Sequence, residues 1–202
     1  TVRNDNSSRF GKFMKVKFDD SGFLVGAHIT KYLLEKSRIV TAAQGERVYH
    51  SFYLVLRNKN KANFALEDDK KYKSVCAGNT VNNKEFDSHE EYQEVNTSME
   101  LMGITAEERE GIWKAVAGVL HFENVEFLPD GEGCMTSSTS ADHITKGTKM
   151  WGIDRATYER ELKETTLVIM GSPVKKLMTI VQAVDARSAV NKAIYDQCFA
   201  FI

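Results

Sequence analysis

A short polar stretch near the start of the chain reads Asn4-Asp5-Asn6-Ser7-Ser8-Arg9-Phe10-Gly11-Lys12. Carboxamides can donate hydrogen bonds to phosphate oxygens, hydroxyls can ligate Mg²⁺ or position a water molecule, and a guanidinium can hold a carboxylate through two bonds. Enzymes that transfer phosphoryl groups use these groups to position nucleotide, metal and attacking water. The alternative is a solvated polar turn, because Asn, Asp and Ser are common in turns.

The residues that follow this stretch predict a β-hairpin. Apolar side chains and lysines alternate from Phe10 to Phe18, a turn cluster occupies residues 19–22, and residues 23–29 form the second expected strand. The β-forming side chains of residues 38–40 predict a third strand. The chain is therefore expected to begin with strands.

The rest of the chain is expected to be mainly helical. A Ser or Thr followed three residues later by Glu is the capping-box pattern that starts helices, and it occurs at Ser88 and at Thr105. Helical spacing and breaker residues predict the remaining elements. The expected helices are 46–56, 141–151, 155–164 and 180–202, the expected strands are 125–128 and 166–170, and the expected loops are 129–140 and 171–173. The fold class is α/β, with strands first and helices after.

Composition argues against several classes of function. Basic and acidic residues number 27 and 28, which leaves a net charge of −1 and no basic excess for nucleic acid. No apolar run approaches the roughly 20 residues of a membrane-spanning helix. The three cysteines are widely spaced and odd in number, which indicates a reducing compartment and predicts a cytoplasmic protein. The histidines lack the spacing of metal ligands, so packing or solvent exposure is expected for them.

Both ends of the chain suggest a piece of a longer polypeptide. The first residues are polar, lead directly into a strand and include no initiator methionine. The last predicted helix reaches Ile202 without a glycine or proline stop signal. We therefore expect an internal fragment.

Five blocks of the sequence resemble the motor domain of myosins. Residues 4–13 match the family's switch I pattern N-x-N-S-S-R-F-G-K-F. Residues 32–40 resemble Y-L-L-E-K-S-R-V, and residues 46–53 resemble E-R-x-Y-H-x-F-Y. Residues 118–127 resemble G-I-L-H-L-G-N-I-x-F, and residues 185–199 are similar to D-A-R-D-A-L-A-K-A-I-Y-x-x-L-F. The blocks occur in the family's order across the chain, so the chain resembles the motor from switch I through its upper, actin-facing half.

The resemblance implies a nucleotide-binding role for the first block. Asn4 would bond the nucleotide phosphates, and Asn6 would line the same pocket. Ser7 would contact the nucleotide and handle the attacking water, and Ser8 would ligate Mg²⁺. Arg9 would pair with a glutamate of switch II when the site closes, so Ser7 and Arg9 would be the catalytic residues. The implied cofactors are ATP and Mg²⁺.

The resemblance also implies two surface loops that face F-actin. The first is the loop of residues 129–140, and the second is the segment of residues 170–178. Ser172 stands where the family carries an acidic or phosphorylatable residue, so phosphorylation by a kinase is one hypothesis and a simple Gly-Ser-Pro turn is the other. The residues implied to face actin are Gly131, Glu132, Gly133, Ser172, Lys175 and Lys176.

The implied architecture is α/β and belongs to a P-loop NTPase-type motor. Residues 1–40 would supply switch I and a hairpin of the central transducing sheet, and residues 41–202 would form the mainly helical upper 50 kDa subdomain. The intact protein would be an ATPase that moves along actin filaments in the cytoplasm, as part of a myosin complex of the actin cytoskeleton. Light chains or calmodulin would bind outside this segment, and neither nucleic-acid binding nor direct membrane insertion is expected.

Two alternatives stay open. The phosphate-cradling loop and switch II are missing from this sequence, so the fragment alone is expected to be inactive. A non-catalytic actin-binding or scaffold module is the main alternative. A kinesin-like NTPase is disfavoured, because kinesins continue the N-x-x-S-S-R core with Ser-His where this chain has Phe10-Gly11. The D-A-L-A-K part of the last block also departs here, to Ser188-Ala189-Val190-Asn191-Lys192.

Overall fold

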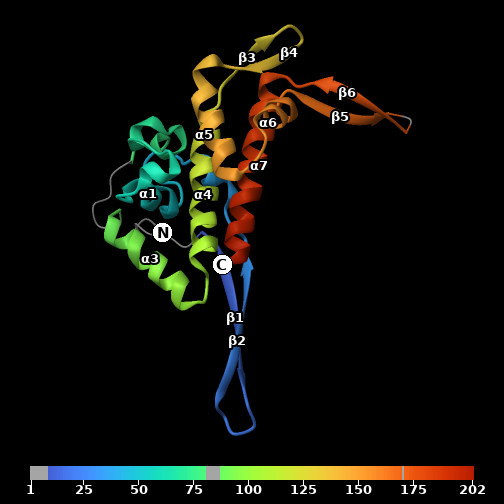
Figure 1. The fold of residues 1–202 in the computed structure, drawn as a ribbon. Helices are drawn as coiled ribbons and strands as arrows, with labels where there is room; N and C mark the ends of the chain where they lie inside the picture. Colours follow the sequence, from blue (N-terminus) through green and yellow to red (C-terminus); the bar gives the residue numbers. More distant parts are fainter. Residues whose placement is uncertain (1–8, 81–86, 170) are drawn as a thin grey trace. The chain divides into compact units, whose positions relative to one another are not determined.

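The computed structural model describes residues 9–80, 87–169 and 171–202. The chain divides into two compact units, Thr1–Lys36 and Ser37–Ile202. Figure 1 shows a long hairpin in the first unit, and helices with two smaller hairpins in the second. The mixture of helices and strands agrees with the sequence analysis. The chain begins with strands and is mainly helical after them, and four of the six described strands lie among the later helices.

The hairpin of the first unit confirms the sequence prediction. Its strands β1 (Gly11–Phe18) and β2 (Leu24–Tyr32) pair antiparallel, and β2 runs past the predicted end at residue 29. The Asp19 carboxylate holds the turn by accepting the main-chain N–H groups of Ser21 and Phe23, both at 2.9 Å. Gly22 then adopts a φ of 83°, which side chains other than glycine rarely tolerate.

Large apolar side chains lie exposed on both faces of this hairpin. Phe13 and Phe18 point to opposite faces of β1 because their positions differ by an odd number, and they are 58% and 63% exposed. Phe23, Val25 and Ile29 are exposed to a similar extent. The hairpin therefore presents two uncovered apolar faces.

The second unit is organised around α4 (Ala106–Glu123), whose apolar side chains are largely buried. Thr105 and Glu108 form the full predicted capping box, and the Ser88 side chain caps α3 (His89–Leu101) by accepting from Glu91 N, so both predicted helix starts are confirmed. The other elements that contact α4 are α1 (His50–Arg57), α2 (Lys73–Cys76), α3, α5 (Ala141–Trp151), α7 (Ile180–Phe201) and the 3₁₀ helix η2 (Lys61–Phe64). The short helix α6 (Arg155–Glu161) packs against α5.

The segment between the hairpin and α1 corrects two predictions. Residues 38–40 do not form a strand: η1 (Lys36–Ile39) is a 3₁₀ turn that buries Arg38, which donates to Arg47 O at 2.6 Å and to Glu46 at 2.5 Å. The helix predicted from residue 46 begins only at His50. The carbonyls that would open it accept side-chain bonds instead, Glu46 O from Thr80 Oγ1 and Arg47 O from Arg38.

Two further hairpins replace predicted loops. β3 (Phe127–Asp130) pairs with β4 (Gly133–Thr136), followed by η4 (Ser138–Ser140), so residues 129–140 are not a continuous surface loop. The strand expected at 125–128 starts later, because Val125 N still bonds to Phe122 O at the end of α4.

β5 (Glu164–Ile169) pairs with β6 (Ser172–Leu177), so Ser172 and Pro173 of the predicted loop belong to a strand. The helix predicted to reach residue 164 ends at Glu161. The sequence analysis missed β6 because Pro and Lys are uncommon in strands. The remaining described element, η3 (Asp69–Lys71), precedes α2.

Two glycines let α4 and α5 approach each other closely. A Cβ on Gly118 would come within 2.0 Å of the Trp151 indole nitrogen, and that nitrogen donates to Ala115 O at 3.1 Å. Gly147 of α5 makes similar room for the Phe122 ring, since a Cβ there would lie 2.8 Å from it. The indole and the phenyl ring therefore fill notches that any larger residue would close.

The last turn of α4 and its cap, residues 121–124, form a polar centre that we name the α4 hub. The buried Glu123 carboxylate accepts from Arg187 Nη2 at 2.9 Å and from Asn191 Nδ2 at 2.6 Å, both on α7. Arg187 also donates to Val125 O. These bonds join the end of α4 to the middle of α7.

Asn124 extends the α4 hub towards α2 and α5. Its Oδ1 accepts from Lys73 N at 2.9 Å, and its Nδ2 donates to Lys71 O at 2.5 Å. The same amide group lies 3.1 Å from His143 Nε2. One turn of helix thus joins three other segments by hydrogen bonds.

We expect Gly118→Ala to lower the free energy of unfolding by about 1–3 kcal/mol, because the new methyl group overlaps the Trp151 indole. The matched control is Gly111→Ala on the same helix, where the added Cβ would meet no atom within 4 Å beyond its chain neighbours and the helix's own backbone. The control should be stabilised by about 0.5–1 kcal/mol, since alanine restricts the unfolded chain. Urea unfolding followed by far-ultraviolet circular dichroism measures both, and equal stabilisation would contradict the close packing of Trp151.

Candidate functional site

The switch I block lies mostly outside the described residues. Asn4, Asn6, Ser7 and Ser8 belong to that part of the chain, so their predicted nucleotide and Mg²⁺ contacts stay predictions. Arg9 is the residue of the predicted site that the structure describes.

Arg9 forms an ion pair at the base of the hairpin in the first unit. Its Nη1 lies 3.2 Å from Glu35 Oε2, and Glu35 N donates to Arg9 O at 3.0 Å. The two side chains are 31% and 39% exposed, and ion pairs at this exposure contribute at most about 1 kcal/mol. The Arg9 guanidinium is therefore directed at a carboxylate, which is the type of partner that the resemblance implies for it. The ion pair with Glu35 is weak enough for Arg9 to change its partner.

The predicted actin-facing residues of the β3–β4 hairpin separate into two environments. Gly131 and Glu132 are exposed at the turn, where Gly131 has a φ of 57°. Gly133 is buried, and a Cβ added there would lie only 3.0 Å from Leu177 Cβ on β6. The surface loop expected at Gly133 is thus a packing contact between the two hairpins of the second unit.

The predicted residues of the β5–β6 hairpin are all exposed. Ser172, Lys175 and Lys176 lie on β6, whose residues are all exposed. Lys175 Nζ lies 2.9 Å from Glu164 Oε2 across the hairpin. This hairpin therefore carries the most accessible of the predicted site residues.

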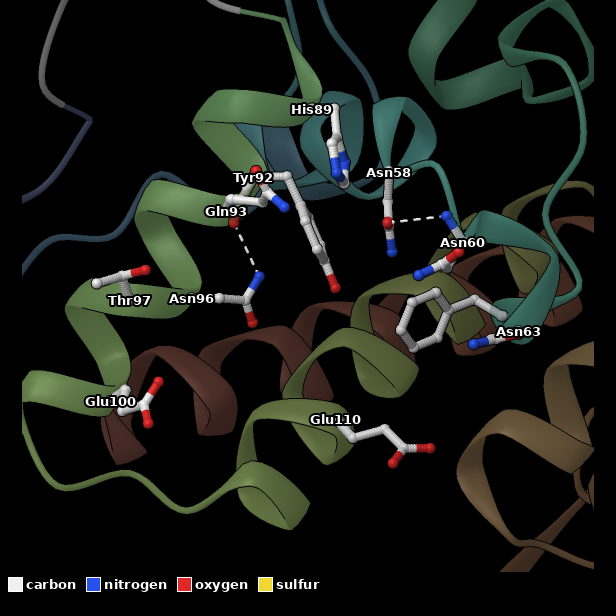
Figure 2. A pocket seen from close by; sticks show the side chains of 11 residues that line it. Asn58, Asn60, Asn63, His89, Tyr92, Gln93, Asn96, Thr97, Glu100 and Glu110 are labelled. Carbon is white, nitrogen blue, oxygen red and sulfur yellow. Dashed lines mark hydrogen bonds between the residues drawn. The ribbon is translucent and has the colours of Figure 1, made fainter.

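A groove of about 630 Å³ lies between α3, the segment that follows α1, and the start of α4 (Figure 2). Its most distinctive feature is a set of five carboxamide side chains, Asn58, Asn60, Asn63, Gln93 and Asn96. The sequence analysis missed this groove, because its lining comes from three segments with no common motif.

The charges at this groove are already neutralised. Glu100 pairs with Arg109 at 3.5 Å, and Glu110 pairs with Lys114 at 2.8 Å. Asn96 is held by Trp113 Nε1, which donates to its Oδ1 at 3.0 Å. The groove can exchange hydrogen bonds with a neutral polar ligand, but its chemistry is not that of a catalytic site.

His121 and His143 form a hydrogen-bonded chain beside the α4 hub. His121 Nε2 lies 3.2 Å from Phe64 O, which can only accept, so this nitrogen carries the proton. His121 Nδ1 then accepts from His143 Nδ1 at 3.3 Å, and His143 Nε2 accepts from the Asn124 amide. This arrangement requires both rings to be neutral.

The electrostatics agree with neutral rings. Burial lowers the pKa of His121 to about 4 and also lowers the pKa of His143. The predicted packing role fits this buried pair. Among the described residues, no group of three or more His, Cys, Asp or Glu side chains could hold a metal ion.

No helix among the described residues is long and apolar enough to cross a bilayer.

Comparison with known proteins now defines the family. The model of the myosin head (motor domain) family matches residues 1–202. The chain is 34% identical to Myosin-14 of Arabidopsis thaliana over 207 residues and 35% identical to the myosin IC heavy chain of Acanthamoeba castellanii over 205 residues. It is 33% identical to unconventional myosin-Vb of Rattus norvegicus over 207 residues.

The alignments take in 100% of this chain each time, but only 14%, 17% and 11% of those relatives. The chain belongs to the myosin head (motor domain) family. It corresponds to a small part of the length of these curated relatives.

We expect stability to fall as the pH drops from 6.5 towards 4. The folded chain keeps His121 neutral down to a pKa of about 4, whereas the unfolded chain binds a proton near 6.5. The unfolded state therefore binds more protons in this window, and about 3 kcal/mol is lost by its lower end. Below that window both states are protonated and this loss stops growing.

The measurement is urea unfolding at a series of pH values. His121→Gln should flatten the slope between pH 6.5 and 4, because the titrating ring is gone. A slope unchanged by this substitution would contradict the neutral histidine chain.

Proposed function

We propose that this chain is part of an actin-based motor ATPase, to which it supplies switch I and part of the actin-facing surface. The observation that carries the proposal is the match to the myosin motor domain over residues 1–202, with the switch I pattern at residues 4–13. In this proposal the motor works in the cytoplasm on the actin cytoskeleton, and light chains or calmodulin bind elsewhere in the intact polypeptide.

The nucleotide site would use the polar block before β1. Asn4 and Asn6 would hold the phosphates, Ser7 would orient the attacking water, and Ser8 would ligate Mg²⁺. Bound Mg·ATP supplies the γ-phosphoryl group that is transferred to water.

Arg9 would close this site by exchanging one carboxylate partner for another. Its exposed pairing with Glu35 shows a guanidinium that already holds a carboxylate, at little energetic cost to release. Exchange of Glu35 for a switch II glutamate would bring the loop over the γ-phosphate and exclude bulk water.

The exposed apolar faces of the β1–β2 hairpin support a place in a larger sheet. An isolated two-stranded hairpin is marginally stable in water, and Phe13, Phe18 and Phe23 lie uncovered on it. Further strands and helices of an intact motor would cover these faces. A hairpin joined to switch I would then move when the nucleotide state changes.

The actin-facing surface would combine the two small hairpins of the second unit. Gly131 and Glu132 are exposed on one hairpin, and Ser172, Lys175 and Lys176 are exposed on the other. The contact of Gly133 with Leu177 joins the hairpins, so both can meet one partner. Phosphorylation of Ser172 would add a charge of about −1.5 to −2 to this surface.

We expect Arg9→Ala in the complete motor to lower actin-activated ATP turnover at least about a hundredfold, because the site can no longer close around the transition state. Nucleotide binding should be largely retained. Steady-state phosphate release and the binding of a fluorescent ATP analogue measure the two properties.

Two control variants separate the latch from a structural role. Lys15→Ala removes an exposed cation from β1 and should leave turnover within about twofold. Glu35→Gln should do the same if Glu35 is only a resting partner of Arg9. Loss of turnover in Glu35→Gln equal to that in Arg9→Ala would contradict the exchange. No turnover in the unmodified motor would favour the scaffold alternative.

A further inference from the structure

We propose that the carboxamide groove of the second unit, between α3, the segment after α1 and the start of α4 (Figure 2), binds an extended, lysine- or arginine-rich segment of a partner polypeptide. None of the residues named above for nucleotide, Mg²⁺ or actin lines this groove. The inference therefore goes beyond the proposed motor function and does not depend on it.

The groove has the size and the rigid walls of a binding site. Its volume of about 630 Å³ falls within the range of roughly 300–1,000 Å³ that is usual for ligand sites. His89, Gln93 and Thr97 follow one another at steps of four along α3, so they line the groove from one face of that helix. The segment after α1 contributes Asn60 and Asn63 to the lining.

One buried side chain in the groove carries a hydrogen-bond donor without an acceptor. Asn58 is only 5% exposed, and Figure 2 shows its side chain directed into the groove beside Tyr92. Its Oδ1 accepts from Asn60 N at 3.0 Å, whereas its Nδ2 has no hydrogen-bond partner among the described residues. A donor in a poorly hydrated position binds an acceptor more strongly than it would in water, so this amide favours a ligand with a carbonyl oxygen.

The other carboxamides fit the main chain of a peptide. Asn60, Asn63 and Gln93 are exposed, and each offers an N–H₂ group and a carbonyl oxygen. An extended peptide presents N–H and C=O groups of its own, whereas a helix uses these groups internally. Because Glu100 and Glu110 are paired with cations, the lining suits an uncharged main chain.

The charge around the groove decides which side chains the peptide carries. Residues 88–110 contain seven glutamates and one arginine, a net charge of −6, whereas the whole chain has a net charge of −1. Three exposed glutamates of this segment form no ion pair among the described residues, and we name them the acidic rim: Glu90, Glu94 and Glu107.

The acidic rim lies beside the groove on two helices. Glu90 comes three residues before Gln93 on the surface of α3, and Glu94 lies one turn beyond Glu90. Glu107 comes three residues before Glu110 on α4. The rim attracts cationic side chains and repels phosphate groups, nucleic acid and acidic peptides.

Simpler cations fit this site less well than a basic peptide. Among the described residues, no group of three or more acidic, histidine or cysteine side chains could hold a metal ion. A polyamine has positive charges but no carbonyl oxygen, so it would leave the Asn58 amide without an acceptor. A basic peptide supplies carbonyl oxygens for the carboxamides and cations for the acidic rim.

The test uses the complete motor that contains this chain and a fluorescently labelled peptide of alternating lysine and threonine, blocked at both ends. Threonine favours an extended conformation. Fluorescence anisotropy measures the affinity, and we expect saturable binding that weakens as salt is added, because salt screens exposed charges. A peptide of alternating glutamate and threonine should not bind, and equal affinity for the two peptides would contradict the role of the acidic rim.

Two charge-matched double variants locate the cationic contacts. Glu90→Gln combined with Glu94→Gln removes two charges from the acidic rim and should weaken binding about tenfold. Glu159→Gln combined with Glu161→Gln removes two charges from α6, outside the groove, and should leave the affinity within about twofold. Equal losses in the two double variants would indicate non-specific attraction and overturn the proposal.

Variants inside the groove test recognition of the main chain. Asn58→Ala should weaken binding at least about tenfold, with its far-ultraviolet circular dichroism reporting whether the fold is kept. Asn63→Ala and Gln93→Ala remove exposed carboxamides, so they test the same contact without a risk to the core, and each should weaken binding about threefold or more. Unchanged affinity in both of these exposed variants would overturn the proposal.

A competitor and a footprint complete the experiment. Spermine should displace the peptide only at a concentration at least about tenfold higher than an unlabelled copy of the peptide, because it has no carbonyl oxygen. Hydrogen–deuterium exchange should slow at residues 58–63 and 89–97 when the peptide binds. Equal displacement by spermine, protection elsewhere, or no saturable binding by about 1 mM peptide would each overturn the proposal. A motor dimer that Gln93→Ala abolishes would assign the groove to a second copy of the chain instead.

Discussion

The buried carboxylate of Glu123 is the interaction on which the second unit depends. An unpaired carboxylate at this depth would be very costly, and burial raises its pKa even though the Arg187 charge opposes the shift. The pair can form only if Arg187 and Asn191 of α7 lie against the last turn of α4. Because Arg187 also binds Val125 O, the same contact places the start of the segment that leads into β3.

Two departures from the family motifs meet in this contact. Glu123 stands where the motif matched by residues 118–127 has glycine, and Asn191 stands where D-A-L-A-K has its second alanine. The two side chains share a hydrogen bond of 2.6 Å although 68 residues separate them. Asn191 alone would leave its buried amide without this acceptor, whereas Glu123 alone would keep its pair with Arg187 and lose one hydrogen bond.

The buried, tightly packed contacts and the exposed predicted site residues lie in different parts of the chain. The α4 hub and the glycine notches of α4 and α5 tie helices together through buried contacts that tolerate little change. Arg9, Ser172 and Lys175 lie on exposed ribbons, where an ion pair can change its partner at small cost. Contacts on these ribbons can therefore change without disturbing the core.

The sequence by itself determined the family, both helix caps, the long hairpin and the bounds of α5, because motifs, capping boxes and periodicity are local signals. It also placed Arg9 just before a strand, but the turn expected at Ser172 is wrong, because Ser172 is the first residue of β6. Only the tertiary structure decided that Gly133 is buried against Leu177 and that His121 meets His143. It likewise decided that the carbonyls of Glu46 and Arg47 accept side chains rather than open a helix. These outcomes depend on contacts between residues that are distant in the sequence. A buried polar group needs a hydrogen-bond partner, and folding determines which groups are buried and which partners they meet.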